Sequence, residues 1–277
     1  MCGPTLVNRK IIRTVRADRW SLWHHDGMAR TAQEDPLAPL AALPGVPEAV
    51  ARARDATTGV HNQPVNRRGW PATAAEAALR AARSSAALDG APLQPATADH
   101  VSDPVLAGAV RIADERARLV ETWERAPLQA LARLHVLAAT DLVPAAEHTA
   151  RLGRPRDGAS GRLSLLADLL GGGTSVPAPV LVAVVHGELL TLRPFGTADG
   201  VVARAAARLT AMTSGLDPRG LSVPEVGFLR RPTEYRAAAE AFATGSAEGL
   251  TGWIVHTCTE WEAGAREGLS IAAAQSA

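Results

Sequence analysis

The sequence predicts an all-α fold, a helical bundle with at most one small β-hairpin, for three reasons. Hydrophobic residues make up 47% of the 277 residues and aromatic residues only 4%, so the apolar content is mainly alanine, leucine and valine, which suit closely packed helices. Apolar residues recur at helical spacing, while period-2 alternation is almost absent. The length favours one large domain with a sizeable core.

Capping residues, prolines and glycines mark the expected helix ends. Thr73 and Glu76 have the spacing of a capping box at the start of a helix that continues to Leu88. Asp103 and Pro104 predict the start of the next helix, because proline at the first helical position loses no hydrogen bond. The further helices expected are 104–120, 127–137, 163–170 (ending at three glycines), 179–192, 200–215, 233–242 and one beginning at 248.

The first 27 residues differ in composition from the rest of the chain. Lys10 is the only lysine, and two tryptophans and two histidines crowd residues 20–25. The segment lacks the apolar core of a signal peptide, so we favour an over-extended reading frame with Met28 as the start, or else a disordered terminus. Residues 28–69 are expected to form a helix and linker whose first part packs weakly, and residues 70–270 the helical domain.

Net charge and cysteine content argue against several classes of function. The net charge is +1 and the arginines are spread along the chain, which argues against nucleic-acid or membrane binding. The longest apolar run, 179–185, is far shorter than the ~20 residues of a spanning helix. Cys2 and Cys258 are too few for a disulfide framework or a thiolate zinc site and suit a cytoplasmic protein. We expect a small ligand or an unidentified protein partner; the oligomeric state stays open.

The segment 183–209 is the most informative part of the chain. It reads AVVHGELLTLRPFGTADGVVARAAARL, a buried helix, a compact loop and the start of a second helix. Gly200 lies at that second helix start, where free N–H groups and the helix dipole favour an anion, and Arg193 and Arg204 flank it. The alternative is that both arginines pair with nearby carboxylates and only hold the loop in shape.

This segment resembles the signature of the Fic, or Fido, family. In that family a helix with an early histidine precedes the pattern HPFxDGNGRxxR. Here His186 takes the early position, and residues 193–204 align without a gap as RPFGTADGVVAR. Further segments resemble the family in order, so the resemblance spans about residues 70–264. It implies a Fic-type helical bundle related to AMP transferases.

The chemistry of the signature has changed although its spacing is retained. The resemblance places Arg193 at the catalytic histidine and Thr197 at the acidic magnesium ligand. A guanidinium cannot act as a base near neutral pH, and a neutral hydroxyl is a poor ligand for magnesium. We therefore predict no metal site and no certain cofactor, and magnesium-bound ATP fits poorly. The residues expected to line a remaining phosphate or nucleotide site are Phe195, Thr197, Asp199, Gly200 and Arg204.

A second segment, RSSAALDG at 83–90, resembles the inhibitory helix of the family. Ser85, Asp89 and Gly90 hold the places of its serine or threonine, its glutamate, and its glycine or asparagine. In the family the glutamate bridges to the second signature arginine and obstructs the site of the terminal phosphate. We therefore expect the charged atoms of Asp89 and Arg204 to lie within about 4 Å. The alternative is two unrelated surface charges, because aspartate is one methylene shorter.

Other candidate groups are expected to be structural. His135, His186 and His256 are lone histidines in predicted helices, and Cys258 has no partner for redox or nucleophilic chemistry. Two functions remain open. We favour a catalytically degenerate Fic-type protein that binds a partner or an anion. The alternative is an active nucleotidyl- or phosphotransferase with altered catalytic residues, which would need another base in the same cleft.

Overall fold

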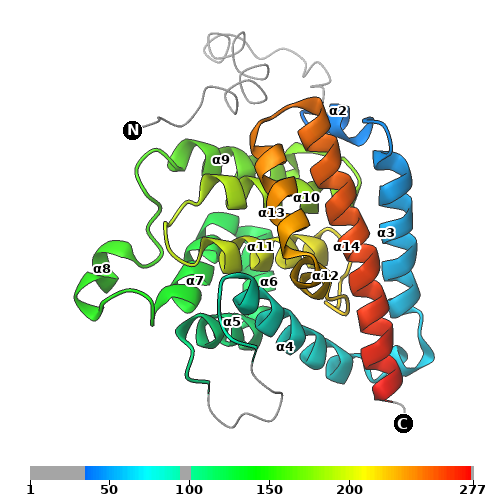
Figure 1. Cartoon of the computed structure of the whole chain (residues 1–277), viewed down its shortest axis with the longest axis horizontal. Coiled ribbons are helices and arrows are strands. Elements are labelled where there is room, and N and C mark those ends of the chain that lie inside the picture. Colours follow the sequence, from blue (N-terminus) through cyan, green and yellow to red (C-terminus); the bar gives the residue numbers. More distant parts are fainter. Residues whose placement is uncertain (1–34, 94–100, 276–277) are drawn as a thin grey trace.

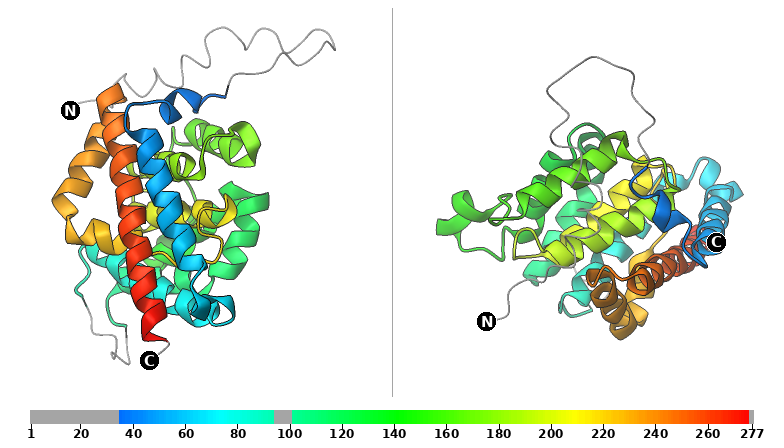
Figure 2. Two further views of the ribbon diagram at one scale, coloured as in Figure 1. Left: turned by 90° about the vertical axis from the view of Figure 1, so that its right-hand side faces the viewer. Right: turned by 90° about the horizontal axis from the view of Figure 1, so that it is seen from above.

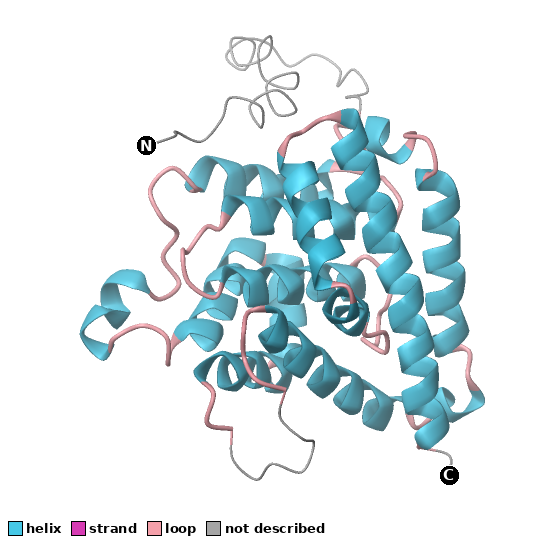
Figure 3. Ribbon diagram, viewed as in Figure 1, coloured by secondary structure: helices cyan, strands magenta, loops and turns pink. Residues whose placement is uncertain are grey.

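A computed structural model describes residues 35–93 and 101–275, and within these ranges it contains helices and no strand (Figure 3). The all-α prediction is confirmed. None of the described helices is long and apolar enough to cross a membrane. The helices are α2 (Ala38–Ala41), α3 (Val46–His61), η2 (Pro64–Arg67), α4 (Trp70–Leu88), α5 (Pro104–Asp114), α6 (Arg116–Arg125), α7 (Pro127–Ala139), η3 (Ala145–Glu147), α8 (His148–Arg151), α9 (Ser160–Asp168), η4 (Leu169–Gly173), α10 (Ala178–Leu192), α11 (Asp199–Thr213), α12 (Pro224–Arg230), α13 (Pro232–Ala243) and α14 (Ala247–Ala274).

Helix α10 lies at the centre of the bundle and packs against α11, α13, α14 and α3 (Figure 1). Val182, Val185 and Leu189 are fully buried in it. The expectation of a buried helix ending at Leu192 is confirmed, because the apolar residues that recur on its face meet neighbours on several sides. Its C-terminal end carries the loop that leads into α11.

Helices α3 and α14 lie side by side along one flank of the molecule (Figure 2). The apolar stripe of α3, including Val46 and Val50, is buried in the same cluster as the apolar face of α14. Leu37 is also buried, and the Asp35 carboxylate accepts a hydrogen bond from Thr174 at 2.7 Å. Residues 28–47 are the first part of the segment that we expected to pack weakly; of the described residues among them, Leu37 and Val46 are buried and the others are half-buried or exposed. Residues 1–34, with the proposed start at Met28, lie outside the described residues.

Local signals set some helix ends and tertiary contacts set others. The Asp103 carboxylate accepts the N–H of Leu106 at 2.9 Å, so α5 begins as predicted. The helix expected over 104–120 instead divides at Glu115 into α5 and α6. The capping box predicted at Thr73 does not form, because α4 already begins at Trp70 and Thr73 lies inside the helix, where its hydroxyl donates to the buried Asn66 side chain at 2.8 Å.

Two further elements depart from the prediction. The short helix expected to stop at three glycines instead continues as the π-helical turn η4, in which Gly172 has a φ of 99°. Helix α12 was not foreseen, because its seven residues are too few to show a helical period. It packs against α4 and α14 and places Glu225 in the interior.

Two glycines of α14 provide a matched test of this packing. A Cβ at Gly264 would lie 2.4 Å from the backbone nitrogen of Pro224, whereas a Cβ at Gly252 would meet nothing within 4 Å. We expect Gly264→Ala to lower the free energy of unfolding by about 1–3 kcal/mol, because backbone must move. Gly252→Ala should leave it unchanged or raise it by up to about 1 kcal/mol. Urea denaturation measures both, and equal effects would contradict the close approach of α14 to α12.

Candidate functional site

A pocket of about 490 Å³ opens where the C-terminal end of α4, the loop between α10 and α11, and helix α13 meet. We call it the α11 pocket, because the first turn of α11 forms part of its wall. Asp89, Arg193 and Arg204 line it, together with Tyr235 and Arg236 from α13. Charged groups of both signs therefore converge on one opening.

The loop of residues 193–198 is held in an unusual backbone conformation. Arg193 and Ala198 have φ values of 46° and 55°, a region that residues other than glycine seldom adopt. Ala198 stands where the Fic signature has a glycine, and its backbone keeps the left-handed form that glycine favours. The Asp199 carboxylate accepts the N–H of Phe195 at 2.9 Å, and the N–H of Arg156 donates to Pro194 at 2.7 Å. These contacts fix the loop from both sides.

Phe195 points into the core rather than into the pocket. Its ring is 5% exposed and stacks on His135, with centroids 4.1 Å apart and planes 4° from parallel. The N–H of Gly153 donates to His135 Nδ1 at 2.9 Å, and burial lowers the pKa of His135 to about 4. Phe195 therefore anchors the loop, and the structure does not place it among the residues that line the pocket.

Asp89 and Arg204 form an ion pair on the first turn of α11. The Arg204 Nη2 atom lies 2.8 Å from Asp89 Oδ1, which confirms that the two charges lie within salt-bridge range. The second oxygen, Oδ2, accepts the N–H of Val201 at 3.0 Å. A Cβ at Gly200 would lie 2.5 Å from both carboxylate oxygens, so the carboxylate packs directly on this glycine. Asp89 thus occupies the helix N-terminus where an anion would bind.

Arg204 is buried, with 2% of its side chain exposed, and several groups satisfy its donors. Its Nε donates to Ser85 Oγ at 2.7 Å, and Nη2 donates to the Ser85 carbonyl at 2.9 Å. The Tyr235 hydroxyl lies 3.4 Å from Nη1 and 2.9 Å from His186 Nε2. Burial by itself would lower the pKa of Arg204, but Tyr235 and Asp89 outweigh it and hold the pKa above its usual value.

Arg193 and Thr197, which the resemblance places at the catalytic histidine and the acidic magnesium ligand, differ from each other in what surrounds them. Arg193 is exposed at the mouth of the pocket and forms no salt bridge with the described residues. Thr197 accepts a hydrogen bond from Arg151 at 3.2 Å. Burial raises the pKa of Asp199, although hydrogen bonds from Phe195 and Gly196 and the charges of two arginines oppose that rise.

A magnesium ion does not fit these residues. The Asp89 carboxylate is engaged by Arg204 and the α11 backbone, and Asp199 holds the loop while its other oxygen, Oδ2, is buried. No group of three or more histidine, cysteine or acidic side chains in the described part of the chain is arranged to hold a metal ion. A hard divalent cation needs several oxygen ligands around an open position.

The sequence predicted the pocket residues on α4, on the loop before α11 and on α11 itself, but it did not predict those on α13. The structure brings the resemblance-based residues Asp89, Thr197, Asp199, Gly200 and Arg204 together with Arg193. Ser85 lies behind Arg204 as its acceptor, and Gly90, with a φ of 98°, ends the α4 segment just after Asp89. Tyr235 and Arg236 of α13 were missed, because no spacing or motif in the sequence connects them to the signature.

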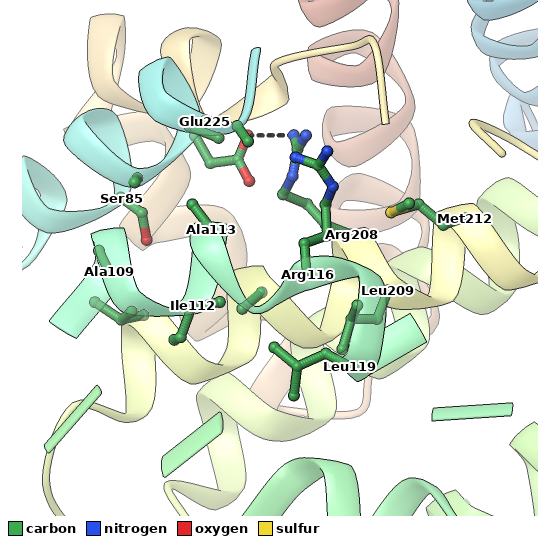
Figure 4. Close-up of a pocket in the computed structure, with 15 residues that line it drawn as sticks. Ser85, Ala109, Ile112, Ala113, Arg116, Leu119, Arg208, Leu209, Met212 and Glu225 are labelled. Atoms are coloured by element: carbon green, nitrogen blue, oxygen red, sulfur yellow. Dashed lines mark hydrogen bonds and ion pairs between the residues drawn. The ribbon is translucent and has the colours of Figure 1, made fainter. Parts of the chain in front are cut away.

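A smaller cavity of about 50 Å³ lies between α4, α5, α6 and α11 (Figure 4). Alanines, Ile112 and Leu119 form most of its wall, and the salt bridge between Arg208 and Glu225, at 3.2 Å, closes one end (Figure 4). An engineered apolar cavity of roughly 150 Å³ holds benzene, and this space is much smaller. We therefore assign this space to imperfect packing of small side chains.

No protein-family model matches the chain, and no curated protein sequence does. Solved structures do match. Fic-1 from C. elegans aligns with a TM-score of 0.64 at 15% identity, covering 83% of this chain and 73% of that chain. A Fic family protein from Desulfovibrio desulfuricans aligns with a TM-score of 0.60 at 20% identity, covering 82% and 74%.

The chain has the Fic fold. This confirms the fold that the signature-like segment implied. At such low identities the similarity establishes fold, and activity has to be argued from the side chains of the α11 pocket.

Substituting Gly200 tests the position of Asp89. Gly200→Ala should lower the free energy of unfolding by about 1–3 kcal/mol, because the new methyl group displaces the carboxylate from the helix. In an Asp89→Ala background the same change should be neutral or stabilising, because alanine is the better helix former. A double-mutant cycle by urea denaturation measures this coupling. Additive effects would show that Asp89 does not rest on Gly200.

Proposed function

We propose that this Fic-fold protein is a catalytically degenerate, cytoplasmic binding protein, and that its α11 pocket takes an anionic group. The main observation behind this proposal is the position of the Asp89 carboxylate on the first turn of α11. The carboxylate receives an N–H from Val201 and a guanidinium from Arg204, which are the donors that bind an external anion at a helix N-terminus. An anionic ligand would compete with Asp89 for these donors.

The residues that align with the Fic signature include no accessible base, which supports a non-catalytic role. Transfer of a nucleotide to a protein hydroxyl requires a group that accepts the proton. Arg193 stands at the position of the catalytic histidine, and a guanidinium stays protonated. His135 is buried against Phe195, and the free oxygen of Asp199 is buried, so neither presents an accessible proton acceptor to the pocket.

The missing metal ligands support the same conclusion. The charge of a nucleotide triphosphate is normally shared with magnesium, and here the phosphates would meet the Asp89 carboxylate directly. Repulsion between like charges disfavours this arrangement as long as Asp89 keeps its place. Phosphate or nucleotide without metal is therefore the form that we expect to bind once Asp89 is removed.

One observation favours the alternative of an altered nucleotidyl- or phosphotransferase. Glu240 is an exposed carboxylate of α13 that lines the α11 pocket. It could accept a proton from a target hydroxyl if the nucleotide were bound by other groups than those of the Fic signature. The two functions differ in whether a labelled protein forms from ATP.

Labelling with radioactive ATP tests the catalytic alternative. The wild-type protein should transfer no label to itself or to lysate proteins above a heat-killed control, and Arg193→His should not restore transfer. The resemblance places Arg193 at the base, Thr197 at the magnesium carboxylate and Val201 at the first signature arginine, and each of these three groups normally stabilises a charged transition state. Labelling that disappears in Glu240→Gln would contradict the proposal and establish the transferase.

Calorimetry with phosphate, ATP and magnesium-bound ATP tests the anion site. Asp89→Ala should bind phosphate and ATP at least about tenfold more tightly than the wild type, a difference of about 1.4 kcal/mol. Magnesium should not strengthen binding. Asp89→Asn keeps the shape of the side chain and serves as the control if Asp89→Ala is unstable. Binding that requires magnesium, or no anion binding by either variant, would contradict the proposal.

A further inference from the structure

Three exposed arginines lie at or beside the α11 pocket, and none of them forms a salt bridge within the described residues. Arg193 and Arg236 line the pocket. Arg156 follows α8 on a segment that lies against the loop, where its guanidinium donates to the carbonyl of Leu192 at 3.3 Å and its side chain packs on Gly196 of the pocket wall. We call these three residues the arginine rim. Arginines on other faces are commonly paired, for example Arg133 with Glu115 at 2.5 Å.

The chain itself shows which chemical group the α11 pocket accepts. The bound group is a carboxylate at the end of a short side chain, with one oxygen 2.8 Å from Arg204 and the other 3.0 Å from Val201. It packs so closely on Gly200 that a single methyl group there would overlap it. This seat fits a planar group with two oxygens, which aspartate and glutamate side chains provide.

We propose that the α11 pocket docks an acidic segment of a partner protein. One aspartate or glutamate of the segment replaces Asp89 on the first turn of α11, and neighbouring acidic residues face the arginine rim. This inference rests on the proposed function and specifies its ligand. It joins two separate observations, the carboxylate site inside the pocket and the exposed arginines at and beside it that form no salt bridge with the described residues, into one surface of complementary charge.

A peptide suits this surface better than a nucleotide or a nucleic acid. The net charge of the chain is +1, and its arginines form no extended stripe that could follow a phosphate backbone. The described residues hold no cluster of ligands for a metal that would accompany a polyphosphate. Glu240 lines the pocket. Its carboxylate repels a misplaced carboxylate and so restricts how an acidic segment lies on the rim.

Fluorescence anisotropy with the full chain tests this inference. The probe is a labelled decapeptide of glutamate and glycine, and its control replaces every glutamate with glutamine. Asp89→Ala should bind the acidic probe at least about tenfold more tightly than the wild type, because the internal competitor is gone. Asp89→Asn provides the same comparison with less risk to folding. The glutamine probe should bind to none of the proteins.

Rim substitutions separate docking from general charge attraction. Arg193→Gln and Arg236→Gln should each weaken probe binding several-fold in the Asp89→Ala background. Arg54→Gln is the matched control, because Arg54 is exposed, forms no salt bridge with the described residues and lines a different pocket. Equal weakening by Arg54→Gln would overturn the inference.

The result with inorganic phosphate distinguishes failure of the anion site from failure of the docking inference. If Asp89→Ala binds phosphate but not the acidic probe, the docking inference is wrong and the anion site stands. If the variant binds neither, both are wrong. If it binds the probe and rim substitutions weaken that binding, the partner surface is supported.

Discussion

The contact between Asp89 and Arg204 on the first turn of α11 is the interaction on which the shape of the site depends. A guanidinium with 2% of its surface exposed needs a counter-charge and several acceptors, since leaving it unpaired costs several kcal/mol. Helix α4 supplies Asp89 and Ser85, and α13 supplies Tyr235. One buried cation therefore joins three helices and sets the width of the pocket between them.

Three local features hold the loop between α10 and α11 in its shape. The loop conformation depends on the carboxylate of Asp199, on the stacking of Phe195 against His135 and on the left-handed backbone at Ala198. None of these contacts requires a proton acceptor at residue 193 or a metal. Backbone strain at such positions persists when the surroundings over-determine it, so the scaffold can serve binding alone.

Local signals in the sequence predicted those helix ends and buried faces that depend on residues close together in the chain. The end of α4 at Leu88, the cap of α5 and the burial of α10 follow from spacing, capping and proline placement. The pairing of Asp89 with Arg204 was predicted only through the resemblance to the Fic family. The break at Glu115, the burial of α3 and the position of Tyr235 depend on contacts between residues far apart along the chain. No local pattern encodes such contacts.

The central claim is that Asp89 fills an anion-binding seat that is otherwise complete. A crystal structure of Asp89→Ala grown with phosphate tests it most directly. We expect phosphate on the first turn of α11, within hydrogen-bonding distance of the Val201 N–H and the Arg204 guanidinium. Water alone at that position, with Arg204 turned toward another carboxylate, would contradict it.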